Sequence, residues 1–142
     1  MLEKINELNS IIKEELWYDF YIDSYKNESI VLKGTLDASY GHNLEIRLEQ
    51  VSYIDAPLQW KTDTTDDIVV SIFSKEDFGE EARKRYFDNA SGLIFGFKAE
   101  CFDSKQWFYF IAQSFSFLHK GKWDSWSWYD KPTPPPIAGI NE

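Results

Sequence analysis

The chain has 142 residues, 43% hydrophobic and 18% aromatic, which is enough for one domain with a hydrophobic core. Its 15 basic and 24 acidic residues give a net charge of −9, which disfavours nucleic-acid binding because phosphate contacts require a basic face. The first sixteen residues are charged throughout, unlike a signal peptide, and no apolar run is long enough to cross a membrane. We therefore expect a cytoplasmic protein that does not bind membranes.

The chain begins with an expected amphipathic helix at residues 2–16. Leu2, Ile5, Leu8 and Ile12 recur at helical spacing, with charged residues between them. We expect this helix to cover one face of a sheet.

The next part of the chain predicts antiparallel strands. Asn27-Glu28 is expected to form a hairpin turn, and the apolar alternation changes phase between Leu48 and Val51, which predicts a β-bulge near Glu49-Gln50. Pro57 is expected to end the last of these strands. Residues 17–24 are expected to form an entry loop and a short strand. Further strands are expected at residues 30–36 and 44–48, the last continuing through Val51 and Tyr53.

Residues 61–67 are polar and predict a loop, and the apolar residues 68–73 predict a short strand. A second helix is expected at residues 75–87. Ser74 and Asp77 have the spacing of a capping box at its start, and Glu80 and Lys84 have that of an ion pair on its exposed side.

Residues 92–129 carry the clearest strand pattern and four of the six tryptophans. They predict two long antiparallel strands, at 93–101 and from Trp107 onward, followed by a third aromatic segment. Residues 107–111 are apolar on both faces, so we expect this part to be covered on both sides. The proline-rich residues 131–142 predict an extended tail. The expected fold is a single α+β domain at residues 1–130, with a mainly antiparallel sheet of about six to seven strands.

Catalytic motifs are absent from the sequence. It has no nucleophile elbow, no glycine-rich phosphate loop, and no His, Cys or Asp cluster at metal-ligand spacing. His42 and His119 lie near expected turns, so both are expected at the surface. We therefore expect a protein that is not an enzyme and that requires no cofactor or metal.

Two segments are candidate binding sites. Residues 63–81 hold seven carboxylates and one lysine, and the spacing of Asp63, Asp66 and Asp67 does not match a calcium loop. This segment is either a solvated loop or an acidic face that meets a basic protein. The second segment contains Trp123, Trp126, Trp128 and Tyr129, which form either a core strand or an aromatic patch that contacts a protein or stacks on a sugar.

Residues 17–60 carry a pattern that includes Phe20-x-x-Asp23-Ser24, the alternating apolar residues 44–54, Pro57 and Trp60. It resembles the front half of small, poorly characterised bacterial proteins that are grouped with immunity proteins of polymorphic toxin systems. One more residue separates Phe20 from Asp23 here than in that pattern. The resemblance implies a bacterial origin, an antiparallel β-rich fold and neutralisation of a toxin, and it supplies no catalytic residues.

These observations lead to three hypotheses. The first is a non-enzymatic protein-binding domain, such as an immunity protein that occludes a basic toxin. The second is a small-molecule or carbohydrate-binding protein that uses the Trp-rich segment. The third is a domain that associates only with copies of itself.

Overall fold

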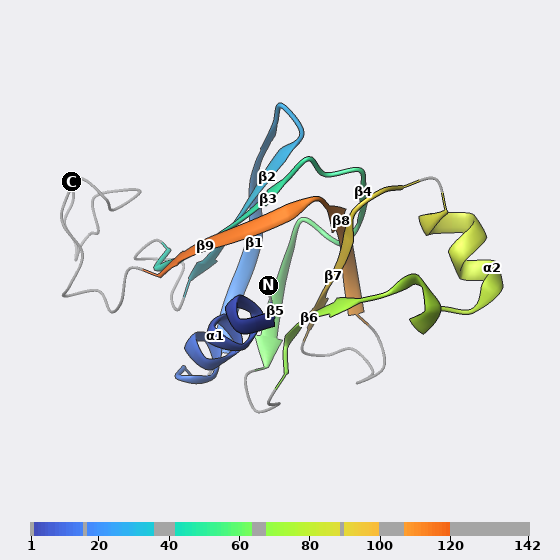
Figure 1. The fold of residues 1–142 in the computed structure, drawn as a ribbon. Helices are drawn as coiled ribbons and strands as arrows, with labels where there is room; N and C mark the ends of the chain where they lie inside the picture. Colours follow the sequence, from blue (N-terminus) through green and yellow to red (C-terminus); the bar gives the residue numbers. More distant parts are fainter. Residues whose placement is uncertain are drawn as a thin grey trace, which may run out of the picture.

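The computed structural model describes residues 2–15, 17–35, 42–63, 68–88, 90–99 and 107–119. These residues form an α+β fold of mostly antiparallel strands, as predicted (Figure 1). One sheet has the strand order β5-β1-β2-β3-β9 and the other has the order β4-β8-β7-β6. The strands of the first sheet are β5 (Gln59–Asp63), β1 (Trp17–Lys26), β2 (Ser29–Thr35), β3 (Leu44–Glu49) and β9 (Ser114–His119). Those of the second are β4 (Tyr53–Asp55), β8 (Trp107–Ala112), β7 (Leu93–Lys98) and β6 (Val70–Phe73).

Two bent strands connect the sheets. Strand β3 continues into β4 and strand β8 into β9, and the two pair with each other in both sheets. Glu49 lies opposite Ser114 and Tyr53 opposite Ile111, so four steps along one strand match three along the other. This extra residue confirms the predicted β-bulge, and Gln50 within it has a positive φ of 53°. If each bent strand is counted once, the described sheets contain seven strands, within the predicted range.

The hydrophobic core fills the space between the two sheets. Phe20 on β1 stacks on Tyr18 at 5.5 Å and on Trp60 of β5 at 5.8 Å, measured between ring centroids. Phe110 of β8 meets this group from the other sheet, 6.3 Å from Trp60. Alternate residues of β8, including Tyr109, pack on the outer side against a second cluster around Phe87. Strand β8 is therefore covered on both faces, as its sequence predicts.

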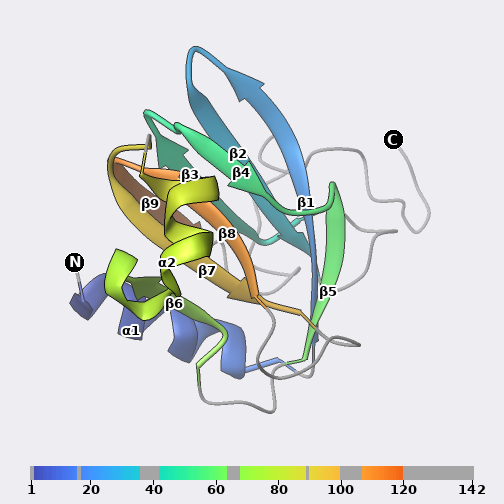
Figure 2. The same ribbon diagram turned by 90° about the vertical axis from the view of Figure 1, so that its right-hand side faces the viewer.

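Helix α1 (Leu2–Lys13) joins the free edges of the two sheets and crosses below the strands in Figure 2. The buried amide of Asn9 accepts hydrogen bonds from the backbone N–H groups of Val69 and Val70, both at 2.9 Å. It donates one to the carbonyl of Val70 at 2.8 Å. The ammonium group of Lys4 donates to the carbonyl of Phe115 in β9 at 3.1 Å. The helix therefore provides hydrogen-bond partners for two strand edges in addition to burying its apolar face.

Residues 59–63 correct one prediction. The sequence predicts a polar loop from residue 61, but β5 is a strand that pairs with β1 along its whole length. Strand β1 is also longer than predicted, and its hairpin to β2 turns at Asn27 and Glu28, whose φ values of 53° and 66° suit a two-residue hairpin. At β5, Trp60 and Thr62 face the core and Gln59 and Lys61 face outward, which is the alternation of an edge strand.

The second helical region is divided. The capping box of Ser74 and Asp77 is present, but it caps the single turn η1 (Lys75–Asp77). Phe78 is extended, and the chain becomes helical again in α2 (Glu80–Ala82) and in the π-helical segment η2 (Arg83–Phe87). The predicted ion pair of Glu80 and Lys84 is present at 3.9 Å. No helix in the described ranges is both long and apolar enough to cross a membrane.

Replacing the buried amide of Asn9 should destabilise the protein. Asn9→Ala leaves the N–H groups of Val69 and Val70 and the carbonyl of Val70 without this partner, so we expect a loss of about 3 kcal/mol in the free energy of unfolding. Ser10→Ala is the matched control, since Ser10 bonds only within its own helix. Urea unfolding measures both, and equal small losses would contradict the role of Asn9.

Stability should fall at high pH because of Tyr18. Burial raises the pKa of its hydroxyl from 10.0 to about 12, so the unfolded chain loses the proton first. The contribution of the protonated Tyr18 hydroxyl to the free energy of unfolding is complete below pH 10 and is lost as the pH rises towards about 12. Urea unfolding across this range should show a smaller alkaline loss for Tyr18→Phe than for the original chain. Some loss should remain, because burial also raises the pKa values of Tyr21 and Tyr109.

Candidate functional site

Most of the predicted site residues lie outside the residues that the structure describes. Asp63 is the last residue of β5, and only its backbone is described. The expected tail at 131–142 also lies outside these ranges, as do the following predicted site residues: Trp123, Trp126, Trp128, Tyr129, Asp66 and Asp67.

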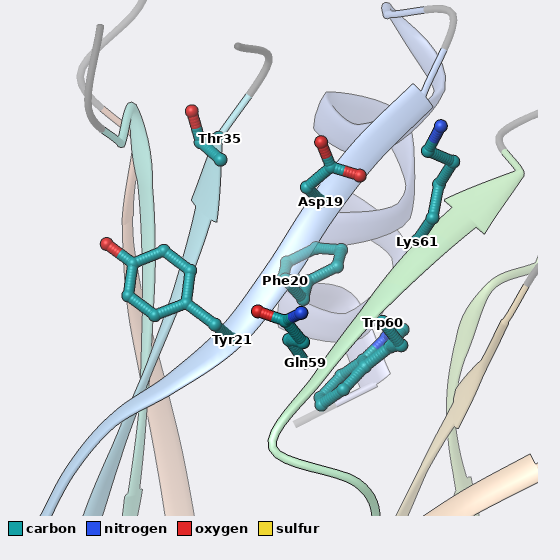
Figure 3. A pocket seen from close by; sticks show the side chains of 7 residues that line it. All are labelled: Asp19, Phe20, Tyr21, Thr35, Gln59, Trp60 and Lys61. Atoms are coloured by element: carbon teal, nitrogen blue, oxygen red, sulfur yellow. The ribbon is translucent and has the colours of Figure 1, made fainter. Parts of the chain in front are cut away.

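A cavity of about 600 Å³ lies at strands β1 and β5, in a place that the sequence does not predict. Its size falls in the range of small-molecule sites, which is about 300–1,000 Å³. Figure 3 shows the described side chains that line it. They are Asp19, Phe20 and Tyr21 from β1, Thr35 from β2, and Gln59, Trp60 and Lys61 from β5.

The strand register sets the positions of the polar side chains. Asp19 lies directly opposite Lys61 on one side and Thr35 on the other. Tyr21 lies opposite Gln59, one step along the same face. Neighbouring strands are about 4.8 Å apart, and alternate residues of one strand are about 6.8 Å apart. Five polar side chains therefore form a compact array over three strands.

Phe20 and Trp60 connect the cavity to the core. Both are almost fully buried, with relative exposures of 1% and 7%, and they lie opposite each other in the register. Because side chains alternate along a strand, their polar neighbours face away from the core. The buried indole nitrogen of Trp60 has no hydrogen-bond partner among the described residues. The cavity thus borders the aromatic core and is otherwise polar.

Charges beside the cavity affect Tyr21. Burial raises the pKa of its hydroxyl, and the nearby carboxylate of Asp23 raises it further. Tyr21 is therefore a neutral phenol at physiological pH, able to donate and to accept a hydrogen bond. The carboxylate of Asp23 lies 3.3 Å from the ammonium group of Lys33 on the next strand.

The histidines differ from expectation in one case. His42 is buried, at 3% relative exposure, and its Nε2 lies 3.6 Å from a carboxylate oxygen of Glu45. The expectation of a surface position is wrong for His42, because the adjacent Asn43 already continues the pairing of β3 with β2, through a hydrogen bond from its backbone N–H to the carbonyl of Gly34 at 3.0 Å. Within the described ranges, no group of three or more His, Cys, Asp or Glu residues is placed to hold a metal ion.

Part of this site could have been read from the sequence. Gln59 and Lys61 alternate with Trp60, and Asp19 and Tyr21 alternate with Phe20, so each segment has one apolar and one polar face. What the sequence does not show is that these two segments pair, because about forty residues separate them.

Comparison with known proteins gives no further guide to the site. No family model matches the chain, and no curated protein and no solved structure matches it significantly. Functional interpretation therefore depends on the geometry and the charge of the chain itself.

The pKa of Tyr21 provides a test of the local electrostatics. Asp23→Asn removes a negative neighbour and should lower the pKa of Tyr21, yet leave it above the ordinary value because burial is the larger cause. Asp55→Asn is the control, since Asp55 acts in the same way on Tyr109. NMR titration of the tyrosine ring carbons measures both. A Tyr21 pKa that responds equally to the two substitutions would contradict this assignment.

Proposed function

We propose that the protein is a non-enzymatic binding domain for a basic protein. The observation that carries the proposal is a run of exposed carboxylates in one projecting part of the chain, of which only Glu80 has a described ion pair, with the exposed Lys84. Residues 76–81 contain four acidic residues and no basic residue, within a chain of net charge −9. All four are exposed.

Aromatic packing holds the segment that carries these carboxylates against the sheet. Phe78 packs against Phe87 at 4.5 Å and against Tyr109 of β8 at 5.1 Å, measured between ring centroids. These contacts fix the acidic segment on the outer side of the four-stranded sheet. In Figure 1 the α2 region stands out from the strands, and in Figure 2 it lies in front of them. Carboxylates held in this way attract a basic partner and raise the rate of association.

A basic toxin is the partner class that we propose, with this protein as its immunity protein. Support comes from the acidic charge and from the pattern at residues 17–60 that resembles immunity proteins. Acidic groups would speed the encounter, and aromatic anchors such as Trp126 and Trp128 would supply most of the affinity in the complex. Asp63, Asp66 and Asp67 belong to the same acidic segment of the sequence, residues 63–81.

A charge-neutralised variant tests the proposal. Glu76, Glu80 and Glu81 are changed together to Gln. The matched control makes the same change at Glu3 and Glu7 on α1 and at Glu14 just after it, which are also exposed. Each triple variant raises the net charge by three. Partners are captured from the source cells by the tagged original chain, identified by mass spectrometry, and purified. The first variant should associate about tenfold more slowly than the original chain at low salt, and the control should not.

Two outcomes would contradict the proposal. One is that no captured protein is basic, or that none is toxic to cells when expressed alone and tolerated when co-expressed with this chain. The other is that both triple variants slow association equally, which would indicate an effect of net charge rather than of this surface. Rates measured at increasing salt should converge for the original chain and the first variant.

A further inference from the structure

We propose that the cavity at β1 and β5 binds a neutral polyhydroxylated ligand, with the hydrogen-bonding character and size of a mono- or disaccharide. This function is separate from the binding of a basic protein. It concerns different residues on a different sheet.

The lining side chains supply both donors and acceptors within one small area. Asp19 accepts hydrogen bonds and Lys61 donates them, while the hydroxyl and amide groups of Tyr21, Thr35 and Gln59 do both. A sugar hydroxyl also donates and accepts, and neighbouring hydroxyls are only a few ångströms apart. An array of mixed donors and acceptors at strand spacing matches such a ligand better than it matches one with a single kind of polar group.

The charges of the cavity favour a neutral ligand. Its two ionic side chains, Asp19 and Lys61, lie opposite each other and have opposite sign. The net charge of −9 over the whole chain also opposes the approach of phosphates and other anions. A cationic ligand that is attracted by Asp19 would be repelled by Lys61, which lies directly opposite it.

The aromatic residues of the cavity have different roles. Trp60 packs against several core rings, including Phe97 and Phe108 at 5.8 and 5.6 Å, so its faces belong to the core. What it can offer is its indole N–H, which has no partner among the described residues. Tyr21 is only half-buried and directs its ring along the outer face of the sheet (Figure 3), where it can contact the C–H groups of a sugar.

NMR titration of the full chain with defined sugars tests the proposal. Glucose, galactose, maltose, cellobiose and lactose are the neutral probes, with glucuronate and glucosamine as charged analogues. At least one neutral sugar should shift the backbone amide signals of residues 19–21 and 59–61. Asp19→Asn and Gln59→Ala should each weaken its binding about tenfold, and Asp55→Asn, on the exposed edge strand β4, should not.

The proposal fails if no neutral sugar shifts these signals, or if the shifts fall elsewhere on the protein. It also fails if both variants bind as the original chain does, or if a charged analogue binds more tightly than its neutral parent. Thermal unfolding verifies that the variants are folded. Gln59 is exposed at an edge strand, so Gln59→Ala should retain the fold even if Asp19→Asn does not.

Discussion

The structure depends on two strands that bend and so belong to both sheets. Glu49 accepts a hydrogen bond from the backbone N–H of Gln113 at 2.9 Å, and Ile111 accepts one from that of Ser52 at 2.8 Å. Pairing thus continues around the bend. Because the bend turns the two halves of the ribbon towards each other, their inner faces enclose the core, and their outer faces become separate surfaces. The free edges left by this arrangement are where α1 attaches through Asn9 and Lys4.

Close packing at the β1–β2 pair determines where the cavity can form. Gly34 lies opposite Phe20, and a Cβ at this position would be 2.9 Å from the Phe20 ring and 3.1 Å from that of Tyr18. The absence of a side chain lets both rings lie against β2, which leaves Phe20 free to stack on Trp60. This aromatic row holds β5 on β1, and the polar residues of both strands are thereby fixed on the opposite face. The site geometry is a consequence of how the core packs.

The sequence predicts those features that depend on local pattern. The helix at α1, the Asn27-Glu28 turn, the bulge near Gln50 and the strands of the central hairpin all follow from periodicity or turn chemistry over a few residues. Strand β5 could not be predicted because its polar face resembles a loop and its partner β1 is distant in the sequence. The division of the helix expected at 75–87 also depends on a contact with a residue that is distant in the sequence. Phe78 leaves the helical path to reach Phe87 and Tyr109, and the chain becomes helical again after Gly79.

The two proposed functions use opposite outer faces of the same core. The acidic segment packs through Phe78 on the outer side of the four-stranded sheet, whereas the polar side chains of the cavity lie on the outer side of the five-stranded sheet. The core between them, with Phe110 on one sheet and Trp60 on the other, is shared. Substitutions of exposed side chains on one face therefore leave the contacts of the other face unchanged. Their effects on the free energy of unfolding should add, because the two sites share no partners. The arrangement allows one surface to meet a protein while the other holds a small ligand. Coupling between the two would have to pass through the aromatic core, whose close packing resists small displacements.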